Sequence, residues 1–184
     1  MNLLTGTAPD AITVGGKSLQ IKTDFQTWVR FLISCENQNP DDMQAALLDI
    51  LGGEMEPIRQ KETVAALLSW LFGESGRSGG ACTPEAAAFD FEADGNVIYC
   101  ELWEYFPAMM ERGITYHEGM EMIKLLLHNE KTMLWHRAFA RCGDFSRLSR
   151  EERSYWQKER LRYRIVRKKR MEQEEMDEIM SKNF

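Results

Sequence analysis

Apolar residues recur with helical spacing along most of this chain, and that periodicity restricts it to a mainly α-helical fold. Stripes at i, i+3, i+4 and i+7 occupy six segments, which are 24–36, 40–51, 57–72, 94–106, 115–127 and 131–141. Strict alternation of apolar and polar residues is confined to Ala11–Val14 and Ser18–Ile21, on either side of Gly15-Gly16. A glycine pair supplies the positive φ angles of a tight hairpin turn. We therefore expect a helical bundle with one small N-terminal β-hairpin.

Capping residues and helix breakers place the helix boundaries. Asn39-Pro40 followed by two aspartates is typical of a helix start, and Gly52-Gly53 of a helix end. Thr23 and Asp94 are the expected N-caps of the first and fourth helices, and Pro107 is expected to break the fourth. The stripes predict a buried core that includes Trp28, Leu47, Leu68, Ile98, Phe106, Ile123 and Phe139.

A glycine- and serine-rich stretch divides the chain. Residues 73–88 hold four glycines between Gly73 and Gly80 and no large apolar side chain, which predicts a flexible loop. The predicted organisation is a hairpin plus three helices over 1–72, this loop, a helical second half over 89–145 that packs on the first, and a C-terminal segment over 146–184. The capping box Ser149–Glu152 opens that last segment, which reaches Met180 without Gly or Pro and predicts a long charged helix.

The net charge is −6, and the charged residues are distributed unevenly along the chain. Residues 147–170 hold eleven Lys/Arg and three acids, or +8, whereas residues 171–184 hold one Lys and five acids, or −4. The remaining 1–146 therefore carry −10. An acidic body with a basic and then acidic tail is typical of a protein that binds a partner.

Several classes of protein are disfavoured by what the sequence holds. Four scattered cysteines show no framework spacing, no apolar run reaches the ~20 residues of a membrane helix, and no signal peptide precedes the hairpin, so we expect a soluble cytoplasmic protein. The three histidines lack metal-ligand spacing, and the acids Asp90, Glu92 and Asp94 are those of a helix start. We expect no catalytic, cofactor-binding or metal-binding residues and no enzymatic activity.

The basic run is the strongest local candidate for partner binding. Its candidate residues combine aromatic and basic side chains: Tyr155, Trp156, Arg160, Arg164, Arg167 and Lys168. Such a set can bind a nucleic-acid backbone and stack on bases, or it can contact an acidic protein surface. The acids between Glu172 and Glu178 would repel phosphates, which favours protein contact and makes nucleic acid the alternative.

Three stretches together resemble one phage family, known as bacteriophage gene product fifteen. They are IKTDFQTWVRF (Ile21–Phe31), FDFEADGNVIYCELWEYF (Phe89–Phe106) and GITYHEGMEMIKLLL (Gly113–Leu127). The chain departs from the family where Glu118-Gly119 replace the tryptophan pair that usually follows the histidine. In order and spacing the resemblance covers about residues 10–165.

The resemblance implies a tail assembly chaperone without a catalytic site. Such a protein binds the tape measure protein, and other tail assembly proteins, in the cytoplasm of the host bacterium and is absent from the mature virion. Flexible methionines suit a surface that accepts varied partners, and five lie within residues 89–145: Met109, Met110, Met120, Met122 and Met133. Self-association is expected as well, because covering a long helix takes many copies. The alternative is a nucleic-acid-binding phage accessory protein that uses the basic C-terminal helix.

Overall fold

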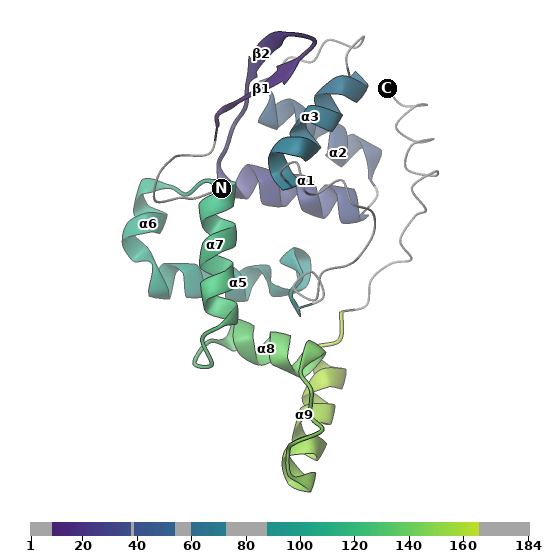
Figure 1. Ribbon diagram of the computed structural model, residues 1–184, viewed down its shortest axis with the longest axis vertical. Helices are drawn as coiled ribbons and strands as arrows, with labels where there is room; N and C mark the ends of the chain where they lie inside the picture. Colours follow the sequence, from purple (N-terminus) through teal and green to yellow (C-terminus); the bar gives the residue numbers. More distant parts are fainter. Residues whose placement is uncertain (1–8, 38, 54–59, 73–87, 166–184) are drawn as a thin grey trace. The chain divides into compact units, whose positions relative to one another are not determined.

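The computed structural model describes residues 9–37, 39–53, 60–72 and 88–165, and this part of the chain is mainly helical with one small antiparallel sheet (Figure 1). This confirms the predicted mainly helical class with a small N-terminal hairpin. The strands are β1 (Ala11–Val14) and β2 (Lys17–Gln20). The helices are α1 (Phe25–Asn37), α2 (Pro40–Ile50), α3 (Gln60–Phe72), α5 (Phe91–Tyr105), α6 (Pro107–Arg112), α7 (Tyr116–Leu127), α8 (Met133–Cys142) and α9 (Arg150–Arg162). None of the helices in the described ranges is both long and apolar enough to cross a membrane.

The hairpin forms where the sequence predicts it, with its second strand one residue earlier than expected. β1 pairs with β2 from Ala11–Gln20 to Val14–Lys17. Gly15 (φ 54°) and Gly16 (φ 78°) form the two-residue turn, and both angles lie in the left-handed region that favours glycine.

The described residues divide into two compact units. The first holds residues 9–37, 39–53, 60–72 and the short segment 115–117, and the second holds 88–114 and 118–165. The predicted loop over 73–88 lies outside the described residues except for Ala88.

Aromatic packing and chain pairing hold the first unit together. Trp28 is fully buried, stacks on Trp70 with ring centroids 4.5 Å apart, and lies 6.0 Å from the ring of Tyr116. The Tyr116 N–H donates to the Thr23 carbonyl at 2.8 Å, beside a β-bridge between Asp24 and Thr115. Segment 115–117 therefore joins this unit through both backbone and ring contacts.

Of the four predicted N-caps, Asn39 and Ser149 are confirmed, and Thr23 and Asp94 are wrong. Asn39 caps α2 as predicted, with its side chain accepting from the Asp41 N–H. At α1 the capping side chain is Asp24, which accepts from the Thr27 N–H at 2.9 Å, so the prediction of Thr23 is wrong. At α5 the N-cap is Asp90 in place of the predicted Asp94, because the chain enters the helix four residues earlier.

Of the seven predicted core residues, four are buried, two are half-buried and one is exposed. Trp28, Leu47, Ile98 and Ile123 are buried as predicted. Leu68 is 40 % exposed, because α3 is turned so that Thr63, Leu67 and Leu71 face inward. Phe106 and Phe139 are half-buried.

In the second unit, helices α5 to α9 bury Ile98, Leu102, Ile123, Leu126 and Leu134. Pro107 begins α6, consistent with the predicted break after α5. The long C-terminal helix is not confirmed, because α9 ends at Arg162 and residues 163–165 are not helical. The Tyr163 carbonyl accepts from Arg141 Nε at 2.7 Å, which ties the chain to α8 at the end of the helix. Residues 166–184 lie outside the described part.

Candidate functional site

Trp156, a predicted partner-binding residue, packs inside the second unit. Its ring lies 4.8 Å from that of Phe139 and 4.7 Å from that of His136, and it stacks on Phe145 at 6.1 Å. The side chain is half-buried. Trp156 therefore joins α9 to α8.

Arg160, another predicted residue, contacts the end of α8. Its Nε donates to the Ala140 carbonyl at 2.9 Å and its Nη2 to the Gly143 carbonyl at 2.7 Å. Its guanidinium also lies 4.2 Å from the centre of the Phe145 ring. A cation at the C-terminal end of a helix satisfies free carbonyls and favours the helix dipole. Arg160 therefore has a packing role within this unit.

The other candidates on the basic run are distributed differently. Tyr155 is 49 % exposed and Arg164 is exposed. Arg167 and Lys168 lie outside the described residues. The structure thus leaves two of the six predicted residues, Tyr155 and Arg164, on the surface of the described chain.

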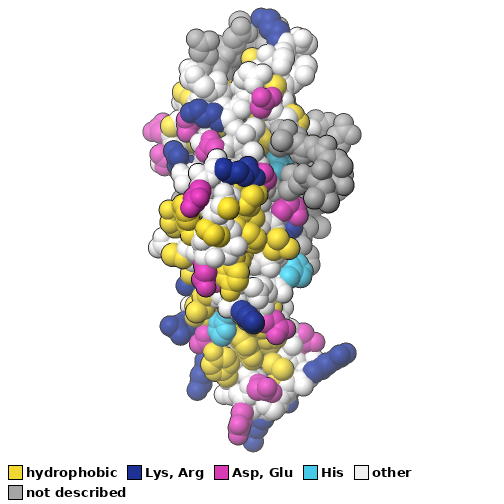
Figure 2. All heavy atoms as spheres, turned by 90° about the vertical axis from the view of Figure 1, so that its left-hand side faces the viewer, with side chains coloured by type: hydrophobic (Ala, Val, Ile, Leu, Met, Phe, Trp, Pro, Cys, Tyr) yellow, Lys and Arg dark blue, Asp and Glu magenta, His cyan; other side chains and the backbone are white. Residues whose placement is uncertain are grey.

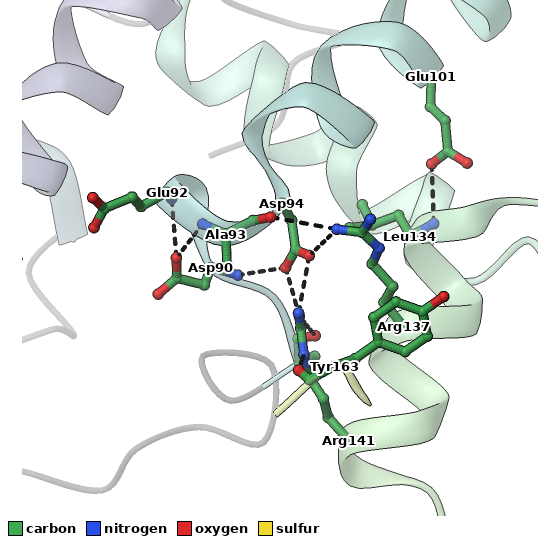
Figure 3. Close-up of polar contacts among 10 residues, drawn as sticks. Asp90, Glu92, Ala93, Asp94, Glu101, Leu134, Arg137, Arg141 and Tyr163 are labelled. Carbon is green, nitrogen blue, oxygen red and sulfur yellow. Dashed lines mark hydrogen bonds and ion pairs between the residues drawn. The ribbon is translucent and has the colours of Figure 1, made fainter. Parts of the chain in front are cut away.

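A buried carboxylate and two arginines form a polar cluster in the second unit (Figure 3). Asp94, fully buried on α5, accepts from Arg137 Nη1 at 2.8 Å and from both terminal nitrogens of Arg141, with 2.9 Å to Nη2. The Asp90 N–H donates to the same carboxylate at 3.0 Å. Burial alone would raise the pKa of Asp94, but the hydrogen bonds from Arg141, Arg137 and Asp90 outweigh it and lower that pKa below its usual value.

The cluster explains why an acid occurs on the buried side of α5, one turn before Ile98. Arg141 also donates to the carbonyls of Ala88 and Tyr163, and Arg137 lies 5.1 Å from the centre of the Tyr163 ring. The carboxylate therefore holds the start of α5, α8 and the end of α9 together. Because two guanidiniums keep Asp94 ionised, its carboxylate is suited to ion pairing and not to proton transfer near neutral pH.

Two further polar contacts brace α8. Glu101 of α5, itself buried, accepts from the backbone N–H groups of Met133 and Leu134 at the start of α8, the second at 3.2 Å. Burial is the main reason why the pKa of Glu101 is raised, although the two N–H groups oppose the rise. On α9, Glu159 Oε2 lies 3.1 Å from His136 Nε2, and this contact lowers the pKa of Glu159.

An exposed apolar surface lies on α5 and α6. We call it the α5–α6 surface and define it by Tyr99, Trp103, Pro107 and Ala108, all of them exposed. Tyr99 is 51 % and Trp103 37 % exposed, and their rings meet edge-to-face at 6.4 Å. Figure 2 shows hydrophobic side chains gathered at mid-height on the face that presents α6 and the end of α5.

This surface was not predicted from the sequence, although one signal was present. Tyr99 and Trp103 are four residues apart and lie one position beyond Ile98 and Leu102, which places them on a different side of α5 from the buried stripe. No Lys or Arg occurs between Arg77 and Arg112. The five methionines divide as well: Met122 is buried, Met109, Met110 and Met120 are half-buried, and Met133 is 48 % exposed.

Metal-ligating groups do not cluster in the described ranges, where no three His, Cys, Asp or Glu side chains are placed to hold an ion. His136 belongs to the α8–α9 contact, and the Nδ1 of His128, just after α7, lies 2.7 Å from the Lys124 carbonyl of that helix.

Comparisons with known proteins yield no relative: no family model, no curated protein and no solved structure matches this chain.

Proposed function

We propose that this protein is a phage tail assembly chaperone that binds the tape measure protein during tail morphogenesis. The observation that carries the proposal is the occurrence, in order, of the three stretches that resemble the gene-product-fifteen family: Ile21–Phe31, Phe89–Phe106 and Gly113–Leu127. The proposal places the protein in the cytoplasm of the host bacterium and outside the mature virion, and it includes self-association along the tape measure protein.

The positions of these stretches support a shared fold as the source of the resemblance. Trp28 of the first stretch contacts Tyr116 of the third, and the two chain segments also pair at Asp24 and Thr115. Asp94 of the second stretch forms the buried ion pair with Arg141. The resembling residues therefore lie at packing contacts, where a fold constrains residue type most strongly.

The α5–α6 surface supports a binding function. A chaperone of a long amphipathic helix has to cover apolar stripes reversibly, and exposed aromatic side chains are suited to that contact. Nucleic-acid binding has less support than protein binding, because Trp156 and Arg160 contact α8 and the loop that follows it.

Co-expression with the tape measure protein of the same genome tests the proposal. We expect the tape measure protein to accumulate in soluble form and to co-purify with this chain. Unchanged solubility together with the absence of a complex would contradict it. Salt-dependent binding of labelled duplex DNA, without such a complex, would instead establish the nucleic-acid function.

A further inference from the structure

The α5–α6 surface combines exposed aromatic side chains with acids that lack a basic counterpart. Glu92, Glu104 and Glu111 are exposed on α5 and α6, and none of them forms an ion pair within the described residues. Arg112, the one basic residue on these two helices, is paired with Glu118 at 2.6 Å. Negative charge around this surface is therefore left uncompensated.

Apolar side chains on the same helices have not been buried by the fold. Tyr99 and Trp103 expose 51 % and 37 % of their surface, and the α6 residues Pro107 and Ala108 are exposed as well. Half-buried Met109 and Met110 add flexible thioether side chains to α6. A cluster of large apolar groups with a polar rim is typical of a site for protein contact.

From this combination we infer that the α5–α6 surface binds an amphipathic helix whose apolar face is flanked by Lys and Arg. The aromatic rings take up the apolar stripe, and Glu104 and Glu111 attract the flanking cations and orient the helix. An acidic helix of the same apolar pattern meets like charges and is rejected. The assignment rests on the proposed function in that it gives the chaperone its partner surface.

A pair of synthetic peptides tests the chemistry of the site with the full chain. Both carry Leu at i, i+3, i+4 and i+7, and the remaining positions are Lys in one peptide and Glu in the other. Fluorescence anisotropy should show the Lys peptide binding and the Glu peptide not binding. Equal binding of the two peptides would overturn the inference.

Variants locate the site. Trp103→Ala should weaken binding of the Lys peptide about tenfold or more, as truncation of a central aromatic residue does. Leu125→Ala is the matched control, because Leu125 is 62 % exposed on α7 and lies outside the surface. Glu104→Lys should weaken binding more than Glu130→Lys, which changes net charge equally in the loop before α8. Unchanged affinity of both surface variants, or equal loss in the controls, would overturn the assignment.

Repeating the co-expression with Trp103→Ala separates this inference from the proposed function. If the tape measure protein co-purifies equally with wild type and variant, the function stands and the surface assignment fails. If the Lys peptide requires Trp103 but no tape measure complex forms, the surface assignment stands and the proposed function fails. Urea unfolding of each variant checks that the fold is retained.

Discussion

Helix α9 and the α5–α6 surface belong to the same unit and differ in what their large side chains contact. On α9, Trp156 and Arg160 are directed to α8 and the loop after it. On α5, Tyr99 and Trp103 contact each other and remain exposed. The helix that looks most like a binding site in sequence thus uses its distinctive residues for packing. Availability of a side chain, more than its type, distinguishes a binding surface from a packing contact.

The largest expected effect comes from breaking the buried ion pairs that hold α8 in place. Asp94→Asn leaves the Arg137 and Arg141 guanidiniums without their carboxylate and should lower the free energy of unfolding by about 3–5 kcal/mol. Asp90→Asn is the matched control in the same motif, because asparagine caps a helix about as well as aspartate. Urea titration of both variants should show a loss at Asp94 alone. Equal stability of the two would contradict the role assigned to the cluster.

A fall in pH should change the contributions of Asp94 and Glu101 to stability in opposite directions. Because folding lowers the pKa of Asp94, its contribution to stability is present above its unfolded pKa of about 4 and is lost as the pH falls below that value. Because folding raises the pKa of Glu101, its protonated form favours folding, and that contribution is lost as the pH rises through the folded pKa. Relative to wild type, Asp94→Asn should therefore gain stability on acidification, and Glu101→Gln should gain it as the pH rises from about 4. Urea unfolding at several pH values measures both slopes, and parallel slopes would contradict this account.

A smaller loss is expected when the aromatic contact between α8 and α9 is removed. Trp156→Ala should cost about 2–3 kcal/mol, less than for a fully buried tryptophan, because the ring is half-buried yet packs on Phe139 and Phe145. Tyr155→Ala, at the neighbouring exposed position, should cost under about 1 kcal/mol. Thermal unfolding of the pair tests whether α9 is held by Trp156, and an equal loss in both variants would mean that it is not.

Substitutions of Arg160 and Arg164, both in the basic run, should also differ in their effect on stability, with smaller losses than for the aromatic pair. Arg160→Ala removes two hydrogen bonds to carbonyls near the end of α8 and should cost about 1–2 kcal/mol. Arg164→Ala should change stability by no more than about 0.5 kcal/mol, because Arg164 is exposed. Denaturant midpoints compared at low and high salt provide the measurement. A larger effect at Arg164 would reverse the assignment of roles along the run.

The smallest effect on stability is expected on the α5–α6 surface. Tyr99→Ala should lower the free energy of unfolding by under about 0.5 kcal/mol, because half of the side chain is exposed and its one ring contact among the described residues is to Trp103. The same change should weaken binding of the Lys peptide. A large loss of stability would show that Tyr99 serves packing, as Trp156 does.

Sequence patterns predicted the parts of this fold that depend on local periodicity. The hairpin follows from alternation around Gly15-Gly16, and the buried positions of Trp28 and Ile123 follow from helical stripes. The same patterns placed Leu68 in the core, because a stripe leaves the rotation of a helix uncertain by about one position.

The buried polar contacts were beyond such reasoning. Asp94 and Arg141 are 47 residues apart in sequence, and the periodicity of apolar residues carries no information about which charges meet. For the same reason the sequence marked Trp156 and Arg160 as available when the fold engages both. The α5–α6 surface was recognisable only once burial had shown which aromatic residues the core leaves out.

The most direct test of the partner surface is hydrogen–deuterium exchange on the complex with the tape measure protein, compared with the free chain. The account predicts slower amide exchange across residues 95–112 of α5 and α6, and unchanged exchange in residues 150–162 of α9. Slower exchange confined to α9 would contradict it, because the basic helix would then be the binding site.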